Sequence, residues 1–280
     1  MDVSLVTVTW NSAKFIGDQA RSVFASEGVT YEFFVVDNAS SDDTVVIVER
    51  DFPQVRLMKN EVNRGFAAAN NQAIRASIGR YVLLLNPDMR VAPDTIAKMV
   101  QHMDAHPEIG VLGPRLVDEQ GNIMPHVRRF PRVSDQAAIL LKLPHVAPTI
   151  LDAYLQKDFD YSKDASVDSV RGSCFMIRRE VIEKIGGLDE RYFIWFEEVD
   201  YCMQVVRAGW KVAYTPTATC VDYVGRSFAL VSGYRKQQYF TTSMVTYFRK
   251  WHPGWRSAVI AVLRPCALAA AWVAEKFRSL

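Results

Sequence analysis

Residues 31–38 read YEFFVVDN, an apolar run of strand length that ends in a carboxylate and an amide. Comparable runs lie at Val3–Trp10 and Tyr81–Asn86, and shorter ones at Arg56–Lys59 and Ile109–Leu112. Aromatic and β-branched residues at this density favour β-strands. The first 115 residues therefore predict five strands, of which Tyr31–Asp37 is the second.

Helical patterns separate these strands, at Ser12–Ala25, Thr44–Asp51, Phe66–Ala76 and Pro93–Ala105. Alternating strands and helices, with strands that are apolar almost throughout, predict an α/β fold whose mostly parallel sheet is covered on both faces. Ligands of such sheets bind beyond the carboxyl ends of the strands. Those ends are polar here, at Trp10-Asn11, Asp37-Asn38 and Asn86-Pro87-Asp88.

Residues 115–170 do not continue this alternation of strands and helices and are expected to be largely irregular. Beyond them, Val170–Arg178 is predicted as a strand, and helices are predicted at Glu180–Ile185, Phe196–Ala208 and Ser232–Trp251. Gly209 is well placed to end the second of these helices. The composition, 49% hydrophobic over 280 residues, provides for a large core and excludes disorder.

The net charge of +2 is unevenly distributed. Residues 201–280 hold eleven Lys and Arg but two Asp and Glu, which gives +9, whereas residues 1–200 carry −7. The last part of the basic segment has two apolar stretches, Ala258–Leu263 and Cys266–Ala274, interrupted by Arg264-Pro265. This pattern favours an interfacial amphipathic segment on an anionic membrane over a spanning helix. A helix that packs on the protein or forms a dimer contact is the alternative, and no nucleic-acid-binding module is present.

The cysteines, Cys174, Cys202, Cys220 and Cys266, form no C-x-x-C pair, so neither zinc nor a disulfide framework is indicated. The chain begins directly with an apolar strand, without the features of a secretory signal. These observations favour a cytoplasmic protein.

Several familiar motifs are absent, namely the G-x-G-x-x-G fingerprint, the P-loop, the G-x-S-x-G elbow and H-E-x-x-H. His102 and His106 stand four residues apart on a predicted helix, but no third metal ligand is near them in the sequence. We interpret them as surface histidines.

Four polar groups could carry chemistry, and each also has a structural explanation. Asp37 could accept hydrogen bonds from a nucleobase or ribose, or cap a turn. Arg64 could face phosphates at a helix start, and Asp88 could hold Mg²⁺ or Mn²⁺ against a diphosphate. Glu197 and Glu198 could stabilise a helix N-terminus, or act as a general base if the surrounding apolar residues raise their pKa values.

The order of these segments resembles that of the family 2 glycosyltransferases, which are inverting enzymes with the GT-A fold, and among them the rhamnosyltransferase-like members. Six stretches carry the resemblance: VSLVTVTWN at Val3–Asn11, FVVDNASSDDT at Phe34–Thr44, NRGFAAANN at Asn63–Asn71, LLLNPD at Leu83–Asp88, GSCFMIR at Gly172–Arg178 and GGLDERYFIWFEEVDYC at Gly186–Cys202. The resemblance implies a Rossmann-like central sheet flanked by helices, with a C-terminal helical extension.

The resemblance also implies a donor site. Val8, Thr9 and Asp37 match the positions that hold the nucleoside, and Arg64 and Asn70 belong to the stretch that closes over the donor. The implied donor-binding set is completed by Asn11, Asn38, Asn63, Gly65, Asn86 and Asp88.

The motifs for metal and base differ from the family pattern. Asn86-Pro87-Asp88 replaces D-x-D, which leaves Asp88 as the implied ligand of Mg²⁺ or Mn²⁺. In the segment 222–227, Asp222 replaces the metal-binding His of H-x-x-G-x-S and is a second candidate ligand. Glu197-Glu198 stands in place of Glu-Asp, whose second acid is the base, so Glu198 is the implied catalytic base with Glu197 beside it. The implied acceptor-side residues are Gly172, Ser173, Trp195 and Asp200.

We therefore expect an enzyme that transfers L-rhamnose from dTDP-L-rhamnose to a cell-surface polysaccharide or lipid-linked glycan. A UDP-sugar donor, a non-catalytic glycan- or partner-binding domain and a sugar-nucleotide pyrophosphorylase are the alternatives. The expected organisation is a catalytic domain over 1–250, with a nucleotide-sugar half at 1–115 and an acceptor half at 116–250. Residues 251–280 would hold it on the cytoplasmic face of the membrane, and a homodimer is possible.

Overall fold

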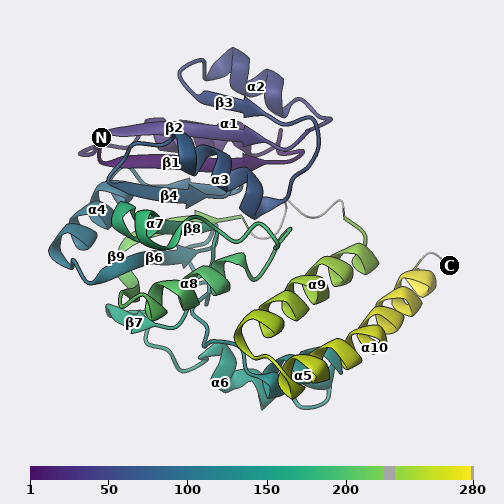
Figure 1. Cartoon of the computed structure of the whole chain (residues 1–280). Helices are drawn as coiled ribbons and strands as arrows, with labels where there is room; N and C mark the ends of the chain where they lie inside the picture. The colour runs from purple at the N-terminus through teal and green to yellow at the C-terminus, as the bar shows by residue number, and fades with distance from the viewer. Residues whose placement is uncertain (224–230, 279–280) are drawn as a thin grey trace.

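A computed structural model describes residues 1–223 and 231–278 of the chain. Within them, nine strands form one sheet in the order β3-β2-β1-β4-β8-β6-β9-β5, and β7 pairs with β9 (Figure 1). The strands are β1 (Val3–Thr9), β2 (Tyr31–Asp37), β3 (Arg56–Lys59), β4 (Tyr81–Leu85), β5 (Met89–Val91), β6 (Ile109–Val117), β7 (Ala165–Val167), β8 (Cys174–Arg178) and β9 (Lys211–Asp222).

The expected parallel arrangement is confirmed for β3, β2, β1 and β4, and β6 is also parallel to β9. The strand β8 lies antiparallel between β4 and β6, and β9 is antiparallel to β5 and β7. Because β8 runs against its neighbours, its first residues lie beside the last residues of β4. The antiparallel strand thus brings a second part of the chain to the edge where the parallel strands end.

Helices cover both faces of the sheet. The helices are α1 (Ile16–Phe24), α2 (Thr44–Asp51), α3 (Phe66–Ala76), α4 (Thr95–Ala105), α5 (Val133–Leu140), α6 (Asp152–Leu155), α7 (Arg179–Ile185), α8 (Glu197–Arg207), α9 (Gly233–Trp251) and α10 (Trp255–Arg278), with short 3-10 helices η1 (Leu143–His145) and η2 (Pro148–Leu151).

Alternate residues of the strands point to opposite faces and build two cores. Leu5, Val35 and Leu83 belong to a core closed by α1, α2 and α4. Val6 and Val36 belong to the other, closed by α3, α7 and α8. Both faces are buried, which explains why apolar residues occur on both faces of these strands rather than at every second position alone.

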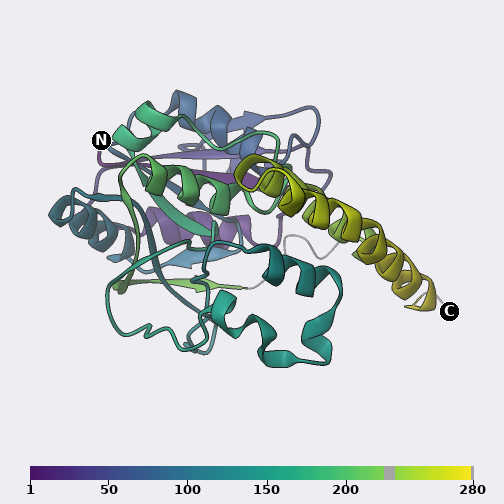
Figure 2. The same ribbon diagram turned by 60° about the horizontal axis from the view of Figure 1, so that its bottom comes forward.

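A third core lies outside the sheet and joins α5, α9 and α10 to the segment before α8. It contains Tyr192, Phe196, Tyr247, Phe248 and Ile260, all nearly or completely buried. In Figure 2 the antiparallel pair α9 and α10 leaves the sheet and extends toward the C-terminus. This pair is the C-terminal helical extension expected from the sequence.

The structure adds elements that the sequence patterns did not indicate. The stretch 115–170, expected to be largely irregular, contains α5, α6, two 3-10 helices and β7. The longest strand, β9, interrupts its apolar residues with three threonines and a proline, which hides its pattern. Its position in the sheet, between β6 and β5, supplies the pairing that its local sequence does not announce.

The helix α10 continues through Arg264 and Pro265, the two residues that interrupt its apolar sequence. Pro265 removes one backbone N–H, but Ile260 and Ala267 on either side are fully buried and hold both halves of the helix against the protein. By length and composition, Trp255–Phe277 could cross a membrane, and it is the single such helix in the described part of the chain.

Gly65 lies where the start of α3 contacts the loop before α8. It has a φ of +82°, and a Cβ there would lie 2.5 Å from the carbonyl oxygen of Phe193. The next residue, Phe66, donates its N–H to that same oxygen at 2.7 Å. The start of α3 is therefore pressed against the loop that precedes α8.

We predict that Gly65→Ala lowers stability more than Gly121→Ala. Both glycines have nearly the same φ, +82° and +83°, but a Cβ on Gly121 would meet nothing within 4 Å. A positive φ costs alanine about 1–3 kcal/mol at either position. At Gly65 the extended ψ of 173° and the clash with Phe193 should add about 1–3 kcal/mol. Thermal unfolding measures the difference, at about 2–4 °C per kcal/mol. Equal shifts in the two variants would show that the Phe193 contact yields without cost.

Candidate functional site

A cleft of about 530 Å³ lies at the edge of the sheet where β1, β2 and β4 end. Its lining residues come from both halves of the chain: Val8, Thr9, Trp10, Ser12, Asn38, Asn63, Gly65, Phe66, Asn86, Pro87, Asp88, Arg171, Gly172, Ser173, Phe193, Ile194, Trp195, Glu197, Glu198, Asp222 and Lys236. Most of the residues that the sequence singles out as a site are therefore neighbours in space.

The loop before α3 is held against the end of β2. Asn38 donates from Nδ2 to the Gly65 carbonyl at 3.1 Å, and Asn63 accepts from the Gly65 N–H at 2.9 Å. Asn38 is almost fully buried, whereas the Arg64 side chain is exposed. The arrangement forms one wall of the cleft, with Asn38, Asn63 and Gly65 lining it.

Four predicted donor residues do not line the cleft. Asp37 accepts hydrogen bonds from Thr9 and from the Ser40 backbone and hydroxyl, so its carboxylate braces the turn after β2. Asn11 accepts from the Ser41 N–H at 2.7 Å, and Asn70 donates to the Phe66 carbonyl within α3. With Arg64, these residues lie behind or beside the wall.

Because β5 pairs with β9, Asp88 and Asp222 lie close together in the fold. Met89 is the register partner of Asp222, and the Tyr223 N–H donates to the Asp88 carbonyl at 3.1 Å. Both carboxylates line the cleft, and both residues are about 95% buried. The rest of the predicted motif, 224–227, lies outside the described residues.

These two carboxylates fit the way a divalent cation binds beside a diphosphate. Mg²⁺ and Mn²⁺ prefer oxygen ligands, and Mg²⁺ sites commonly use one or two carboxylates together with phosphate oxygens. Arg171 donates from Nη1 to Asp222 Oδ2 at 2.8 Å, so the guanidinium partly neutralises the pair. Among the described residues no group of three His, Cys, Asp or Glu could hold a metal. The imidazole rings of His102 and His106 stack on each other, with their centroids 4.5 Å apart.

Glu197 and Glu198 begin α8 after two residues with an unusual backbone conformation. Trp195 and Phe196 have φ values of 66° and 70°, a left-handed conformation that costs bulky side chains free energy. Phe196 is buried in the third core, and Trp195 packs edge-on against Phe240 of α9. The turn directs both glutamates into the cleft, where both are lining residues.

Three polar atoms of this wall are buried without a hydrogen-bond partner among the described residues: Glu197 Oε2, Glu198 Oε2 and Ser173 Oγ. Unsatisfied buried oxygens are costly, and their concentration in one cleft indicates that a polar ligand completes them. Ser173 is there because β8 is antiparallel: the Asn86 N–H donates to its carbonyl at 2.9 Å.

The environment raises the pKa values of both glutamates above the ordinary 4.5. For Glu197, burial is the main cause and the charge of Glu198 adds to it. Burial also raises the pKa of Glu198, but its backbone N–H and the Arg171 guanidinium oppose the rise. Because two close carboxylates resist double ionisation, the pair favours a proton on Glu197 and a charge on Glu198.

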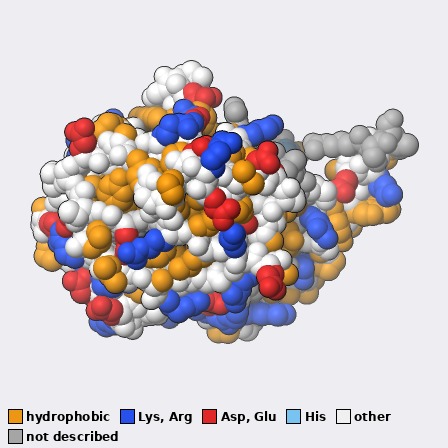
Figure 3. Space-filling model, turned by 90° about the horizontal axis from the view of Figure 1, so that it is seen from above, with side chains coloured by type: hydrophobic (Ala, Val, Ile, Leu, Met, Phe, Trp, Pro, Cys, Tyr) orange, Lys and Arg blue, Asp and Glu red, His pale blue; other side chains and the backbone are white. Residues whose placement is uncertain are grey.

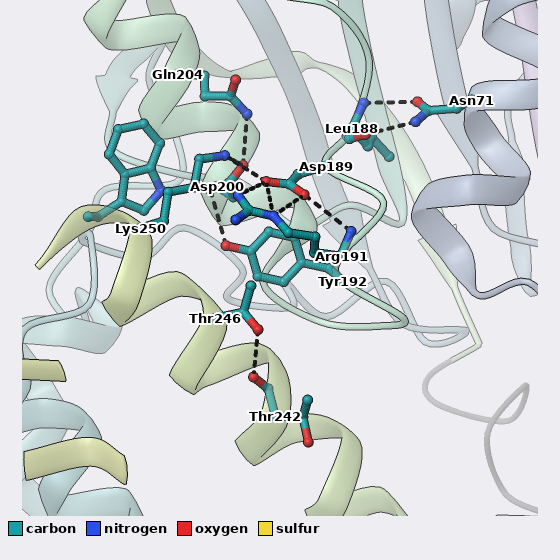
Figure 4. Close-up of polar contacts among 11 residues, drawn as sticks. Asn71, Leu188, Asp189, Arg191, Tyr192, Asp200, Gln204, Thr242, Thr246 and Lys250 are labelled. Atoms are coloured by element: carbon teal, nitrogen blue, oxygen red, sulfur yellow. Dashed lines mark hydrogen bonds and ion pairs between the residues drawn. The ribbon is translucent and has the colours of Figure 1, made fainter. Parts of the chain in front are cut away.

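Asp200 does not reach the cleft, which corrects its expected acceptor-side position. Its side chain is fully buried, and it accepts hydrogen bonds from Lys250 at 2.7 Å and Trp251 at 2.6 Å. Tyr192 and Gln204 also donate to it (Figure 4). Asp200 therefore connects the first turn of α8 to the end of α9.

Sequence reasoning missed two basic residues of the cleft, Arg171 and Lys236. Arg171 directly precedes the predicted Gly172, and Lys236 is one of several basic residues at the start of α9, so neither stood out locally. The net positive charge of residues 201–280 was the available signal for Lys236. Together they supply the cations that a phosphorylated ligand needs in a cleft with four carboxylates.

Comparisons with known proteins agree with this geometry. A family model described as "Glycosyl transferase family 2" matches residues 4–186. The chain is 28% identical over 237 residues to the N-acetylglucosaminyl-diphospho-decaprenol L-rhamnosyltransferase of Mycobacterium tuberculosis, covering 80% of this chain and 76% of that one. It is 26% identical over 175 residues to rhamnosyltransferase WbbL of Escherichia coli, covering 59% and 64% of the two chains.

Two solved structures share the fold. The mannosyltransferase PcManGT from Pyrobaculum calidifontis, in complex with GDP-Man and Mn²⁺, aligns with a TM-score of 0.61 at 21% identity, over 97% of this chain and 73% of its own. S. aureus TarS in complex with UDP aligns with a TM-score of 0.58 at 17% identity, over 94% and 70%. Both alignments cover most of this chain, and the expected GT-A fold is confirmed.

We predict that Lys250→Met destabilises the protein by about 3 kcal/mol, because it leaves the buried Asp200 carboxylate without its counter-charge. The double variant Asp200→Asn/Lys250→Met should be less destabilised than Lys250→Met alone. Lys59→Met is the control, since Lys59 forms an exposed pair with Glu49 worth about 0–1 kcal/mol. Urea unfolding measures all three. A Lys250→Met protein as stable as the parent would contradict the prediction.

Proposed function

We propose, for a chain that belongs to glycosyl transferase family 2, that it transfers L-rhamnose from dTDP-L-rhamnose to a hydroxyl group with inversion of configuration. That it is a glycosyltransferase follows from its family and its relatives. The donor is suggested by the two rhamnosyltransferases among those relatives. The acceptor would be a cell-surface polysaccharide or a lipid-linked glycan precursor.

One observation carries the proposal: two buried, unsatisfied carboxylates face two further carboxylates and two basic side chains across a single cleft. Displacement at an anomeric carbon needs a base for the incoming hydroxyl and positive charge for the departing diphosphate. The cleft offers both kinds of group.

Glu198 is the proposed base. The proximity of Arg171 favours its ionised form, while Glu197 retains the proton that the pair shares. An ionised Glu198 can accept the proton of an acceptor hydroxyl as its oxygen attacks the anomeric carbon. The reaction is then one displacement, in which the C–O bond to the acceptor forms while the bond to the nucleoside diphosphate breaks.

Residues on the opposite wall hold the donor. Val8, Thr9 and Asn38 line the part of the cleft where the nucleoside would lie, and Arg171 and Lys236 bring positive charge toward the phosphates. Asp88 and Asp222 are the proposed ligands of Mg²⁺ or Mn²⁺, which when bound would neutralise diphosphate charge. Asp37, Asn11 and Asn70 would act through the backbone that they brace.

The acceptor side is apolar, with Phe193, Ile194 and Trp195 next to the glutamates. Sugar rings commonly bind against such apolar and aromatic surfaces, with polar groups fixing their orientation. The Mycobacterium tuberculosis relative is named for a diphospho-decaprenol acceptor, which supports a lipid-linked acceptor here. We propose accordingly that the enzyme works at the cytoplasmic face of the membrane, held there by residues 251–280. A homodimer stays a possibility that light scattering would decide.

A UDP-sugar donor is the main alternative, and a domain that binds glycans without catalysis is the other. A panel of dTDP- and UDP-sugars distinguishes all three. Release of dTDP from dTDP-rhamnose supports the proposal, release of UDP supports the alternative donor, and no release from any donor supports a binding domain.

We predict that Glu198→Gln lowers kcat by about 10²–10⁴, the usual contribution of a general base, while dTDP-rhamnose still binds. Glu197→Gln is the matched control: a neutral amide imitates the protonated acid, so kcat should stay within about tenfold of the parent. If Glu197→Gln were the more damaging change, the two roles would be reversed.

The pH profile provides a second readout for this pair. The base must be ionised, and burial raises its pKa, so kcat/KM should fall as pH drops through a value above the ordinary 4.5. Glu197→Gln removes a neighbouring acid and should not raise the pH at which kcat/KM falls.

We predict that Asp88→Asn weakens binding of dTDP-rhamnose in the presence of Mg²⁺ but not in its absence. The amide preserves the shape of the side chain while removing a charged ligand. Isothermal titration with and without the metal measures the effect, and Asp94→Asn, on the exposed turn before α4, is the control. Equal donor affinity for the Asp88 variant under both conditions would refute its role as a ligand.

A further inference from the structure

The helix α10 presents a continuous apolar stripe to solvent. We call this the outer stripe: it consists of exposed residues spaced three or four apart, so that they share one face of the helix. Trp255, Val262 and Phe277 are 68%, 72% and 74% exposed. The full set is Trp255, Ala258, Val262, Cys266, Ala269, Val273 and Phe277. It extends over about 33 Å at 1.5 Å per residue.

The opposite face of α10 is attached to the protein along most of its length. Ile260 and Ala267 are fully buried in the third core. Between them, Arg264 donates to the hydroxyls of Thr241 and Thr242 on α9, at 3.2 and 2.9 Å.

Near its end, the carboxylate of Glu275 accepts the Tyr234 N–H at 2.7 Å. Arg264 and Glu275, which interrupt the apolar sequence, thus contact α9, and neither belongs to the outer stripe.

We propose that the outer stripe docks in the plane of an anionic membrane. A spanning orientation would surround the helix with lipid, and would strip Arg264 and Glu275 of their partners on α9. An in-plane orientation leaves these contacts intact and places the apolar face alone at the headgroup boundary. In Figure 3, the arm at the right of the view carries hydrophobic side chains along its edge with basic ones beside them.

Charge selects a lipid surface rather than a second copy of the chain. A two-fold dimer through this face would bring together two copies of α10, each with four Lys or Arg and one Glu, a net charge of +3. Anionic headgroups attract the same charge, by about 1 kcal/mol for each Lys or Arg near the surface. Trp255, which belongs to the outer stripe, is 68% exposed, and tryptophan favours the headgroup level of a membrane.

This docking would place the cleft beside the lipid surface. The Glu275–Tyr234 contact joins the end of α10 to the first turn of α9, and Lys236, two residues further along, lines the cleft. A lipid-linked acceptor could then reach Glu198 from the membrane, a consequence that rests on the proposed function. Docking itself requires neither donor nor acceptor.

Cys266 allows a direct test without a mutation in the stripe. It is the exposed cysteine of the described chain, whereas Cys174, Cys202 and Cys220 are buried. We expect its labelling by a water-soluble maleimide to slow by about tenfold when vesicles of phosphatidylcholine and phosphatidylglycerol are added, because the stripe enters the headgroup region. Vesicles of phosphatidylcholine alone should have a much smaller effect, and Cys266→Ser should abolish labelling.

Two valine variants provide matched controls. Val262→Glu, in the outer stripe, should lose the protection, whereas Val46→Glu, at a 54% exposed position of α2, should keep it. Each adds one negative charge, and both should release nucleotide from the donor at the parental rate. Donor turnover is measured separately, so its absence would count against the proposed function and not against docking.

Three outcomes would overturn the proposal. Unchanged labelling of Cys266 with anionic vesicles would exclude docking through the stripe. Protein that resists extraction by alkaline carbonate would indicate a spanning helix. Protection that rises with protein concentration in buffer, together with a dimer in light scattering, would assign the stripe to a second copy.

Discussion

The buried contact between Asp200 and Lys250 is the constraint on which the site depends. It joins the first turn of α8 to the last turn of α9 and places a fully desolvated carboxylate beside its counter-charge at 2.7 Å. Trp251 and Tyr192 complete the hydrogen bonds that the carboxylate needs. With α8 held in this way, the strained turn at Trp195 and Phe196 can direct Glu197 and Glu198 into the cleft, where solvation would otherwise favour a more open arrangement.

The same arrangement explains the division of charge along the chain. Four carboxylates line the cleft, and a diphosphate would be repelled by them without compensating cations. Arg171, paired with Asp222 at 2.8 Å, and Lys236 from α9 supply positive charge from within the chain. The basic C-terminal quarter therefore serves the cleft through α9 as well as presenting α10 to solvent, and one helical pair connects the two.

Much of the fold could be predicted from local pattern. The strands β1, β2 and β4 are mostly apolar because both faces are covered. Their polar ends at Trp10-Asn11, Asp37-Asn38 and Asn86-Pro87-Asp88 indicated the edge that holds the cleft. The sequence patterns did not predict the elements whose structure depends on pairing or packing with distant segments. The threonine-rich β9 has no distinctive pattern of its own, and α10 remains helical through Pro265 because α5 and α9 pack against it.

By itself, the sequence determined the family resemblance, the α/β class and most residues of the cleft, because strand composition and strand-end polarity are local properties. Tertiary structure alone decided which polar residues face the cleft and which brace it. Asp200 and Glu198 are two residues apart, yet one is bound to Lys250, 50 positions away, and the other opens into the cleft. Arg171 joined the site through Asp222, 51 positions away. Partners at such separations are set by how the antiparallel strands and the C-terminal helices pack, which a local pattern does not encode.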